Sequence, residues 1–202
     1  GECSTLTSAE REIILENVTN IITPYTEYKK NIMIGVGGNN TKECIHNVEI
    51  AKKFGYDLFM VTTPYYNKPS QQGMIEHFKK IAKTFQSDRF IMYNVPGRTN
   101  INLLPETVKT IVDYCPNYIG IKEASGNMEQ IMQIIKYRPS GFGVLSGDDN
   151  LTMPLIAAGA DGVISVVANA FPALFSSMVH ATMRGELDAA REAHYKLFDV
   201  TK

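Results

Sequence analysis

The sequence predicts an α/β protein of the (β/α)8 barrel class, and three observations lead to this prediction. Short β-rich runs alternate with segments of helical periodicity along the whole chain. The runs are apolar at consecutive positions, as parallel strands covered by helices must be. Polar or special residues follow almost every run, which is typical of strand ends that gather around one rim of a barrel.

The strands are expected over six runs: Ile32–Gly35, Leu58–Thr62, Phe90–Tyr93, Tyr118–Ile121, Phe142–Leu145 and Gly162–Ser165. A doubly wound sheet is the alternative, with a ligand bound where the strand order reverses. The segments after the strands favour the barrel, because they would share one rim: GGNNT, TPYYN, NVPGRT, KEASGN, SGDD and SVVAN. Since a barrel needs eight strands, we expect an incomplete one that lacks about two strands at its front.

The helices are expected between and after these strands. The first begins after Thr7, which forms a capping box with Glu10. Asp148 or Asp149 is expected to cap a helix over Met153–Ala158. The other helices begin at Thr41 and near Met128, or cover Gln71–Phe85, Pro105–Tyr114, Ala170–Arg184 and Leu187–Thr201.

Composition excludes several classes of function. The 202 residues carry 20 Lys and Arg against 21 Asp and Glu, without a block of like charge, so neither nucleic acid nor an acidic membrane surface is an expected partner. Three widely spaced cysteines predict reduced thiols rather than disulfides. The turn GVGGNNT has Asn40 where a dinucleotide-binding motif needs glycine. Asp148 and Asp149 lack a third carboxylate, so no metal site is expected.

The segment YIGIKEASGN (118–127) contains the main candidate for catalysis. Tyr118, Gly120 and Lys122 share one face of the strand, and the glycine leaves space below the lysine in a barrel interior. Desolvation lowers the pKa of such a lysine, and the neutral amine can attack a carbonyl to form a Schiff base. An ordinary strand-end lysine that reaches water is the alternative, which this strand taken alone favours.

Two residues near the end of a neighbouring strand strengthen the catalytic interpretation. Tyr93 ends that strand, and a phenol near a Schiff-base lysine can shuttle protons. Arg98 follows in the same loop, shaped by Pro96 and Gly97, and can hold a carboxylate with two parallel hydrogen bonds. A packed tyrosine and a solvent-exposed arginine are the alternatives.

Five segments resemble, in order and spacing, those of the dihydrodipicolinate synthase family: TPYYNKPSQQG, YNVPGRTN, GIKEASGN, LSGDDN and GVISVVAN. The resemblance covers essentially the whole chain and implies a (β/α)8 barrel with a C-terminal helical extension. We therefore expect a partial barrel over residues 1–184 and the start of the extension over 185–202. It also implies a cytoplasmic lyase, a homodimer or homotetramer, that condenses pyruvate with aspartate 4-semialdehyde in lysine and diaminopimelate biosynthesis. No metal or organic cofactor is implied, because the imine itself is the electron sink.

The resemblance assigns roles to individual residues. Lys122 matches the lysine that forms the imine with pyruvate, and Tyr93 matches the tyrosine of the proton relay. Tyr66 matches the tyrosine that completes the relay in a neighbouring subunit, and Arg98 matches the arginine that holds a substrate carboxylate. The residues that match positions lining the site near the lysine are Gly147 and Ile164.

The resemblance also points to an effector site. In the family, lysine inhibits by binding at a dimer interface, and the matching residues here are Asn39, Glu43 and Tyr65. Ser8 and Arg11 stand where lysine-sensitive members carry histidines. We therefore expect weak inhibition by lysine or none.

The sequence departs from the family pattern at its front. Gly1 and Glu2 match the end of a GTTGE motif that supplies a relay threonine, so the chain is expected to be truncated there and after the start of the extension. The 202 residues alone are expected to have little activity and low stability. N-acetylneuraminate lyase, 2-keto-3-deoxy sugar-acid aldolases and an inactive fragment are the alternatives. Arg98 favours the synthase, because it suits a short charged aldehyde better than a sugar chain.

Overall fold

The computed structural model describes residues 2–25 and 32–201, which form two compact units divided between Ile119 and Gly120. Gly1, part of the expected leading motif, and Lys202 lie outside the described residues. The strands are β1 (Ile34–Gly35), β2 (Leu58–Thr62), β3 (Arg89–Asn94), β4 (Tyr118–Glu123), β5 (Gly143–Ser146) and β6 (Gly162–Val163). β1, β2 and β3 pair in parallel and in chain order, as do β4, β5 and β6. The expected alternation of strands and helices is confirmed.

Two strands are shorter than expected. β1 begins at Ile34 rather than Ile32, and its register with β2 covers only Ile34 opposite Phe59 and Gly35 opposite Met60. β6 ends at Val163 rather than Ser165. The amide of Ile164 still donates to Ser146 of β5, but the amides of Val166 and Val167 bind a buried carboxylate instead of a neighbouring strand, so the backbone turns there.

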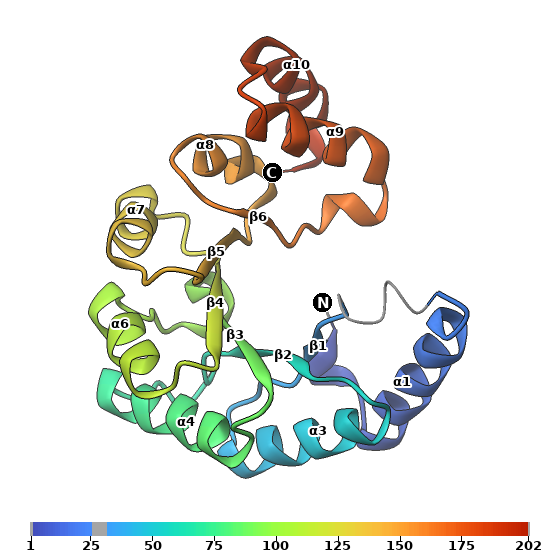
Figure 1. The fold of residues 1–202 in the computed structure, drawn as a ribbon, viewed down its shortest axis with the longest axis vertical. Coiled ribbons are helices and arrows are strands. Elements are labelled where there is room, and N and C mark those ends of the chain that lie inside the picture. The colour runs from blue at the N-terminus through green and yellow to red at the C-terminus, as the bar shows by residue number, and fades with distance from the viewer. Residues whose placement is uncertain (1, 26–31, 202) are drawn as a thin grey trace. The chain divides into compact units, whose positions relative to one another are not determined.

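Helices of the first unit lie along one side of β1, β2 and β3 (Figure 1). The expected capping box is confirmed: the amide of Thr7 donates to Glu10 Oε2 (2.8 Å), and the amide of Glu10 donates to Thr7 Oγ1 (3.3 Å). Arg98 lies on a one-turn helix rather than in the expected loop, since Pro96 fits the first turn of a helix. The bounds are α1 (Ser8–Ile22), α3 (Thr41–Lys53), α4 (Gln71–Thr84), α5 (Pro96–Thr99) and α6 (Pro105–Tyr114), after a 3-10 turn over Cys3–Thr5.

Aromatic side chains fill the core of the first unit. The ring of Phe90 lies 5.6 Å from Phe59 and 5.5 Å from Tyr118, and Tyr118 lies 5.6 Å from Phe78. The hydroxyl of Tyr118 donates to the carbonyl of Phe78 (3.1 Å), so this buried phenol has a partner. Helix α4 is thereby held against the strands by both apolar contact and a hydrogen bond.

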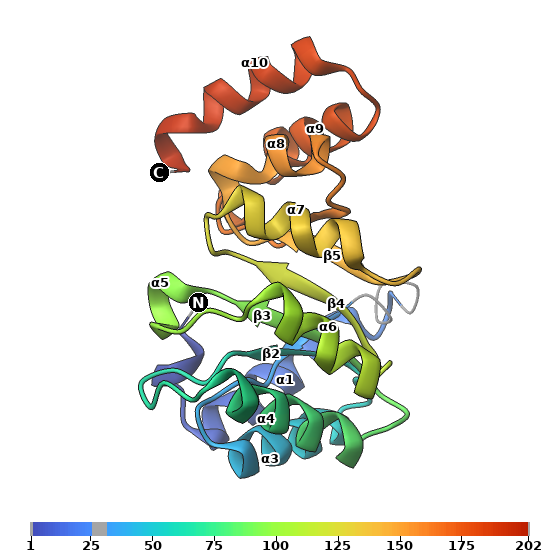
Figure 2. The same ribbon diagram turned by 90° about the vertical axis from the view of Figure 1, so that its left-hand side faces the viewer.

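The second unit carries α7 (Met128–Tyr137), α8 (Thr152–Ala157), α9 (Pro172–Met183) and α10 (Leu187–Leu197). Helix α10 lies beside α9 (Figure 2), and both contribute to one apolar core with α8. The core residues are Ile156, Phe175, Met178, Val179, Ala193 and Leu197. The last helix, expected over Leu187–Thr201, ends four residues early at Leu197. A 3-10 turn over Phe198–Val200 follows it.

The aspartate cap expected before α8 is wrong. A 3-10 turn over Asp149–Leu151 precedes the helix, and Asp148 makes no side-chain capping bond. The carboxylate of Asp149 binds amides after β6 instead. In the described part of the chain, no helix is both long and apolar enough to span a bilayer. The same residues contain no cluster of three His, Cys, Asp or Glu that could hold a metal ion.

Candidate functional site

Lys122 lies near the carboxyl end of β4 and is only 8% exposed. In the β4–β5 register it pairs with Leu145, so its side chain emerges beside the segment that follows β5. A Cβ on Gly147 would lie 3.0 Å from Lys122 Cε and 2.7 Å from the Cβ of Ala124. Gly147 therefore leaves the space that the lysine side chain occupies.

Burial sets the electrostatics of this amine. It lowers the pKa of Lys122, because the protonated form loses its hydration. The negative charges of Asp149 and, to a smaller extent, Asp148 act in the opposite direction. Burial also raises the pKa of Asp148. The net lowering for Lys122 favours the neutral amine, which is the nucleophilic form.

Glu123, the residue after Lys122, fixes the end of β4 through its hydrogen bonds. Its side chain is fully buried, and its Oε1 accepts from the amide of Ser125 (2.8 Å) while Oε2 accepts from Gln130 Nε2 (3.1 Å). Its carbonyl accepts from the amide of Gly147 (2.7 Å). Sequence reasoning did not single out Glu123, although a carboxylate inside an apolar strand was a signal that it had buried partners.

Asp149 joins the segment after β5 to the segment after β6. Its side chain is 8% exposed, and Oδ2 accepts from the amides of Val166 (3.0 Å) and Val167 (2.8 Å). The amide of Ile164 donates to the carbonyl of Ser146 (2.9 Å), which continues the strand pairing by one residue. Sequence reasoning considered Asp149 only as a cap or a metal ligand and missed this link.

The carboxyl ends of β2 and β3 carry the second set of candidates, in the first unit. Tyr93 pairs with Thr62 in the strand register, and its carbonyl accepts from the amide of Thr63 (3.0 Å). The hydroxyl of Thr63, itself buried, donates to Thr99 Oγ1 (3.3 Å) and so fixes α5 to the end of β2. Arg98, on the same helix, is exposed.

Tyr66 is highly exposed, at 88%. Its φ of 73° lies in the left-handed region, which is strained for a residue with a large side chain. The neighbouring Tyr65 is half-buried. The loop after β2 therefore holds one tyrosine against the protein and presents the next to its surroundings.

A hydrogen bond brings one of the three candidate effector residues to this loop. The carbonyl of Asn39 accepts from Asn67 Nδ2 (3.2 Å), which links the segments after β1 and β2. Glu43 is exposed in the first turn of α3, and Tyr65 lies two residues before Asn67. Asn39 and the Tyr65 loop are thus brought together.

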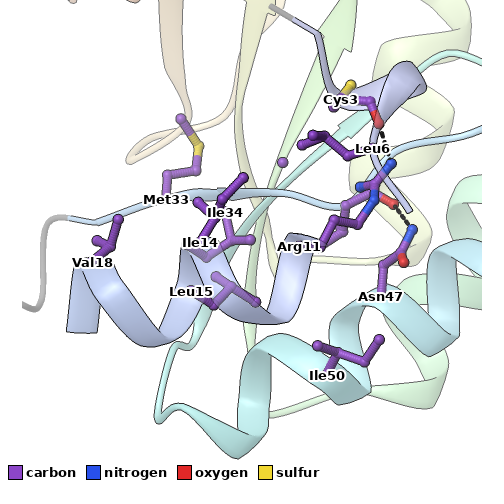
Figure 3. Close-up of a pocket in the computed structure, with 12 residues that line it drawn as sticks. Cys3, Leu6, Arg11, Ile14, Leu15, Val18, Met33, Ile34, Asn47 and Ile50 are labelled. Carbon is purple, nitrogen blue, oxygen red and sulfur yellow. Dashed lines mark hydrogen bonds between the residues drawn. The ribbon is translucent and has the colours of Figure 1, made fainter. Parts of the chain in front are cut away.

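The first unit also contains a cavity of about 230 Å³ between α1, β1 and α3 (Figure 3). Its polar groups include Arg11, which donates to the carbonyl of Cys3, and Asn47, which donates to the carbonyl of Val36 (3.4 Å). Apolar side chains make up most of the remaining wall: Leu6, Ile14, Leu15, Val18, Met33, Ile34 and Ile50. The cavity contains none of the predicted catalytic residues.

Comparison with known proteins places the chain in a family. The model of the Dihydrodipicolinate synthetase family matches residues 1–202. A 4-hydroxy-tetrahydrodipicolinate synthase from Maridesulfovibrio salexigens is 42% identical over 197 residues, which are 98% of this chain and 66% of that protein. The chain thus spans about two thirds of the length of the curated relatives it matches.

Solved structures agree over the full chain. The crystal structure of dihydrodipicolinate synthase from Aquifex aeolicus has a TM-score of 0.91 and 39% identity, with 100% of this chain and 67% of that chain covered. A chloride-inhibited dihydrodipicolinate synthase from Acinetobacter baumannii complexed with pyruvate has a TM-score of 0.90 and 33% identity, again over 100% and 67%. The predicted fold class, a set of six strand–helix units from a (β/α)8 barrel, is confirmed. The chain belongs to the dihydrodipicolinate synthetase family.

Proposed function

We propose that the protein is a 4-hydroxy-tetrahydrodipicolinate synthase, a lyase of the cytoplasm that condenses pyruvate with aspartate 4-semialdehyde. The observation that carries this proposal is Lys122, a buried lysine with a lowered pKa at the end of a parallel strand. Its support is the name of relatives at 42% identity and the pyruvate held by a solved relative. Lysine and diaminopimelate biosynthesis is the corresponding pathway.

The reaction begins with the neutral amine of Lys122 attacking the keto carbon of pyruvate. The carbonyl oxygen takes up protons and leaves as water, and the nitrogen becomes part of a cationic iminium. Loss of a proton from the methyl carbon gives an enamine, which forms a bond to the aldehyde carbon of the second substrate. The aldehyde oxygen takes up a proton to become a hydroxyl, and the iminium reforms. The amino group of that substrate then attacks the imine carbon, which closes the ring and releases Lys122.

The remaining residues serve this sequence of steps. Tyr93 and Tyr66 move protons, Arg98 holds the carboxylate of the aldehyde, and Gly147 and Ile164 line the pyruvate site. No metal or organic cofactor takes part, because the iminium withdraws electrons from the new carbanion. The exposure of Tyr66 (88%) supports a homodimer or homotetramer, in which this side chain acts in a neighbouring subunit.

Two further assignments belong to this proposal. The barrel part covers residues 1–184 and the helical extension begins at Gly185, whose φ of 75° ends α9. Asn39, Glu43 and Tyr65 form the effector site, with weak response to lysine or none. A lysine titration of turnover checks the effector site, and inhibition in the low micromolar range would contradict the expected weak response.

The test of the catalytic proposal is reduction with borohydride in the presence of pyruvate. We expect a covalent adduct on Lys122, located by peptide mass spectrometry, and its complete loss in Lys122→Ala. Lys136→Ala is the matched control, because Lys136 is a solvent-facing lysine on α7, and its adduct yield should equal that of the unmodified protein. No adduct on the complete protein, or an adduct on another lysine, would contradict the mechanism.

A substrate comparison tests the choice within the family. Aspartate 4-semialdehyde should be consumed together with pyruvate, whereas N-acetylneuraminate should not be cleaved. Cleavage of the sugar acid with no consumption of the semialdehyde would assign the protein to the sister aldolases.

A further inference from the structure

Asp149 has a carboxylate of which only one oxygen is satisfied. Oδ2 accepts two amides, but Oδ1 is buried and, in the part of the chain that the structure describes, has no hydrogen-bond partner. A buried oxygen without a partner costs free energy that two amide bonds to its neighbour only partly offset. The arrangement therefore indicates that Oδ1 interacts with a hydrogen-bond donor or a cation during the reaction.

Lys122 is a cationic residue of the second unit that can fill this role. Its Cε lies against Gly147, two residues before Asp149, and Asp149 is the first of the charges that favour its protonated form. Asp148 is the second such charge, and is less buried than Asp149. Glu123, the remaining carboxylate beside Lys122, already accepts hydrogen bonds on both oxygens.

We propose that Asp149 is a positioning residue whose carboxylate is the counter-charge for the nitrogen of Lys122 whenever that nitrogen is cationic. This inference rests on the proposed function. Imine formation consumes the neutral amine, the ketone and one proton, and yields an iminium cation and water. The positive charge then lies in a site from which water is largely excluded, where an unpaired cation is costly.

The two amide bonds to Oδ2 give this counter-charge a fixed position. Because the amides of Val166 and Val167 hold one oxygen, the carboxylate does not need to reorient when the iminium forms. The same bonds join the segments after β5 and β6. Asp149 therefore both fixes these two segments and supplies the negative charge near Lys122. The enamine is neutral, and the nitrogen becomes cationic again when the enamine attacks the aldehyde, so the counter-charge serves both iminium stages.

The experiment separates the charge from the hydrogen bonds. Asp149→Asn keeps an oxygen that can accept from the two amides but removes the charge, whereas Asp149→Ala removes both. Asp161→Asn is the matched control, because Asp161 also accepts a backbone amide, that of Val144 (2.7 Å), but lies immediately before β6 rather than beyond the carboxyl end of a strand. The rate of pyruvate-dependent borohydride trapping is measured against pH for each full protein, together with its melting temperature.

We expect Asp149→Asn to melt close to the unmodified protein and to trap pyruvate more than about tenfold more slowly at its plateau. Its pH profile should move to lower pH, because Lys122 loses a charge that raises its pKa. Asp161→Asn should leave rate and profile unchanged. An Asp149→Asn protein with the original rate and profile overturns the counter-charge, whether or not its melting temperature falls. If the unmodified protein traps no pyruvate, the proposed function itself fails.

Discussion

The two sets of candidate residues are built in opposite ways. At the end of β4, Lys122 is 8% exposed and the carboxylates around it are held by amides of the same unit. In the loop after β2, Tyr66 is 88% exposed on a left-handed backbone. The first set is a closed environment that lowers the pKa of one amine, whereas the second leaves a tyrosine side chain exposed at the surface.

The difference follows from what each group has to do. A lysine is nucleophilic only when it has lost its proton, and removal from water favours the neutral form, so the environment of Lys122 must be closed. The phenol of Tyr66, which we propose acts in another subunit, must instead be accessible. The strain at its backbone is acceptable because a flanking residue, Asn67, is hydrogen-bonded to Asn39. Stability and catalysis should therefore respond differently to substitutions in the two regions.

Gly147→Ala should have the largest effect, because it adds a methyl group beside the buried side chain of Lys122. The new Cβ meets the Ala124 Cβ and Lys122 Cε at 2.7 and 3.0 Å, so the lysine must shift. We expect a loss of about 2 kcal/mol in the free energy of unfolding and about a hundredfold slower trapping of pyruvate. Denaturant unfolding and the borohydride assay measure the two effects.

The control for this substitution is Gly97→Ala, because a Cβ at Gly97 has nothing within 4 Å. It should leave the unfolding midpoint unchanged. Equal destabilisation by both substitutions would show that the space beside Lys122 is not the reason for glycine at position 147.

Tyr66→Phe should separate catalysis from stability. The side chain is exposed, so the unfolding free energy should not change, while turnover should fall by roughly a hundredfold if the hydroxyl relays protons. Steady-state kinetics and thermal melting are measured on the same protein. Tyr137→Phe, at a site that is 61% exposed on α7, is the matched substitution and should change neither quantity. A Tyr66→Phe protein with normal turnover would remove Tyr66 from the relay.

His77 should have the smallest effect near neutral pH and a clear one in acid. Its Nδ1 shares a hydrogen bond with Oγ1 of Thr41, the first residue of α3 (2.9 Å). Burial lowers the pKa of His77 from 6.5 to about 4. The unfolded state therefore binds more protons between these values, and stability falls as pH decreases from 6.5 toward 4. The loss should reach about 3 kcal/mol.

Urea unfolding at a series of pH values measures this loss, with His77→Gln as the test variant. The variant should lose much of the acid dependence, whereas His46→Gln, at an exposed position on α3, should keep it. Identical pH dependence in His77→Gln and the unmodified protein would contradict the role of His77.

Much of the fold could be predicted from the sequence, because local patterns decide it. β2 has the expected bounds, Pro105 begins a helix that ends at Tyr114, and the Thr7–Glu10 capping box is present. Periodicity and capping chemistry act over a few residues and leave a direct record in the sequence. The early end of β6 depends instead on Asp149, which lies 17 residues from the amide of Val166 that it binds.

The candidate site was predictable only in part for the same reason. Lys122 was identifiable as a polar residue inside an apolar run, which is a local signal. Glu123 and Asp149 depend on partners contributed by other elements, and the sequence does not record which amide a carboxylate will meet. An aspartate after a strand predicts a helix cap about as well as it predicts a link between loops.

The neighbouring positions of Lys122 and Glu123 make the chemistry depend on strand alignment. Successive side chains of a strand point to opposite faces, and β4 is aligned on β5 with Lys122 opposite Leu145 and Glu123 opposite Ser146. A shift of the chain by one residue would put Glu123 in place of Lys122 and so replace the proposed nucleophile by an anion that repels keto acids. Under the proposed mechanism, accurate alignment of β4 and β5 during folding is thus as necessary as the lysine itself.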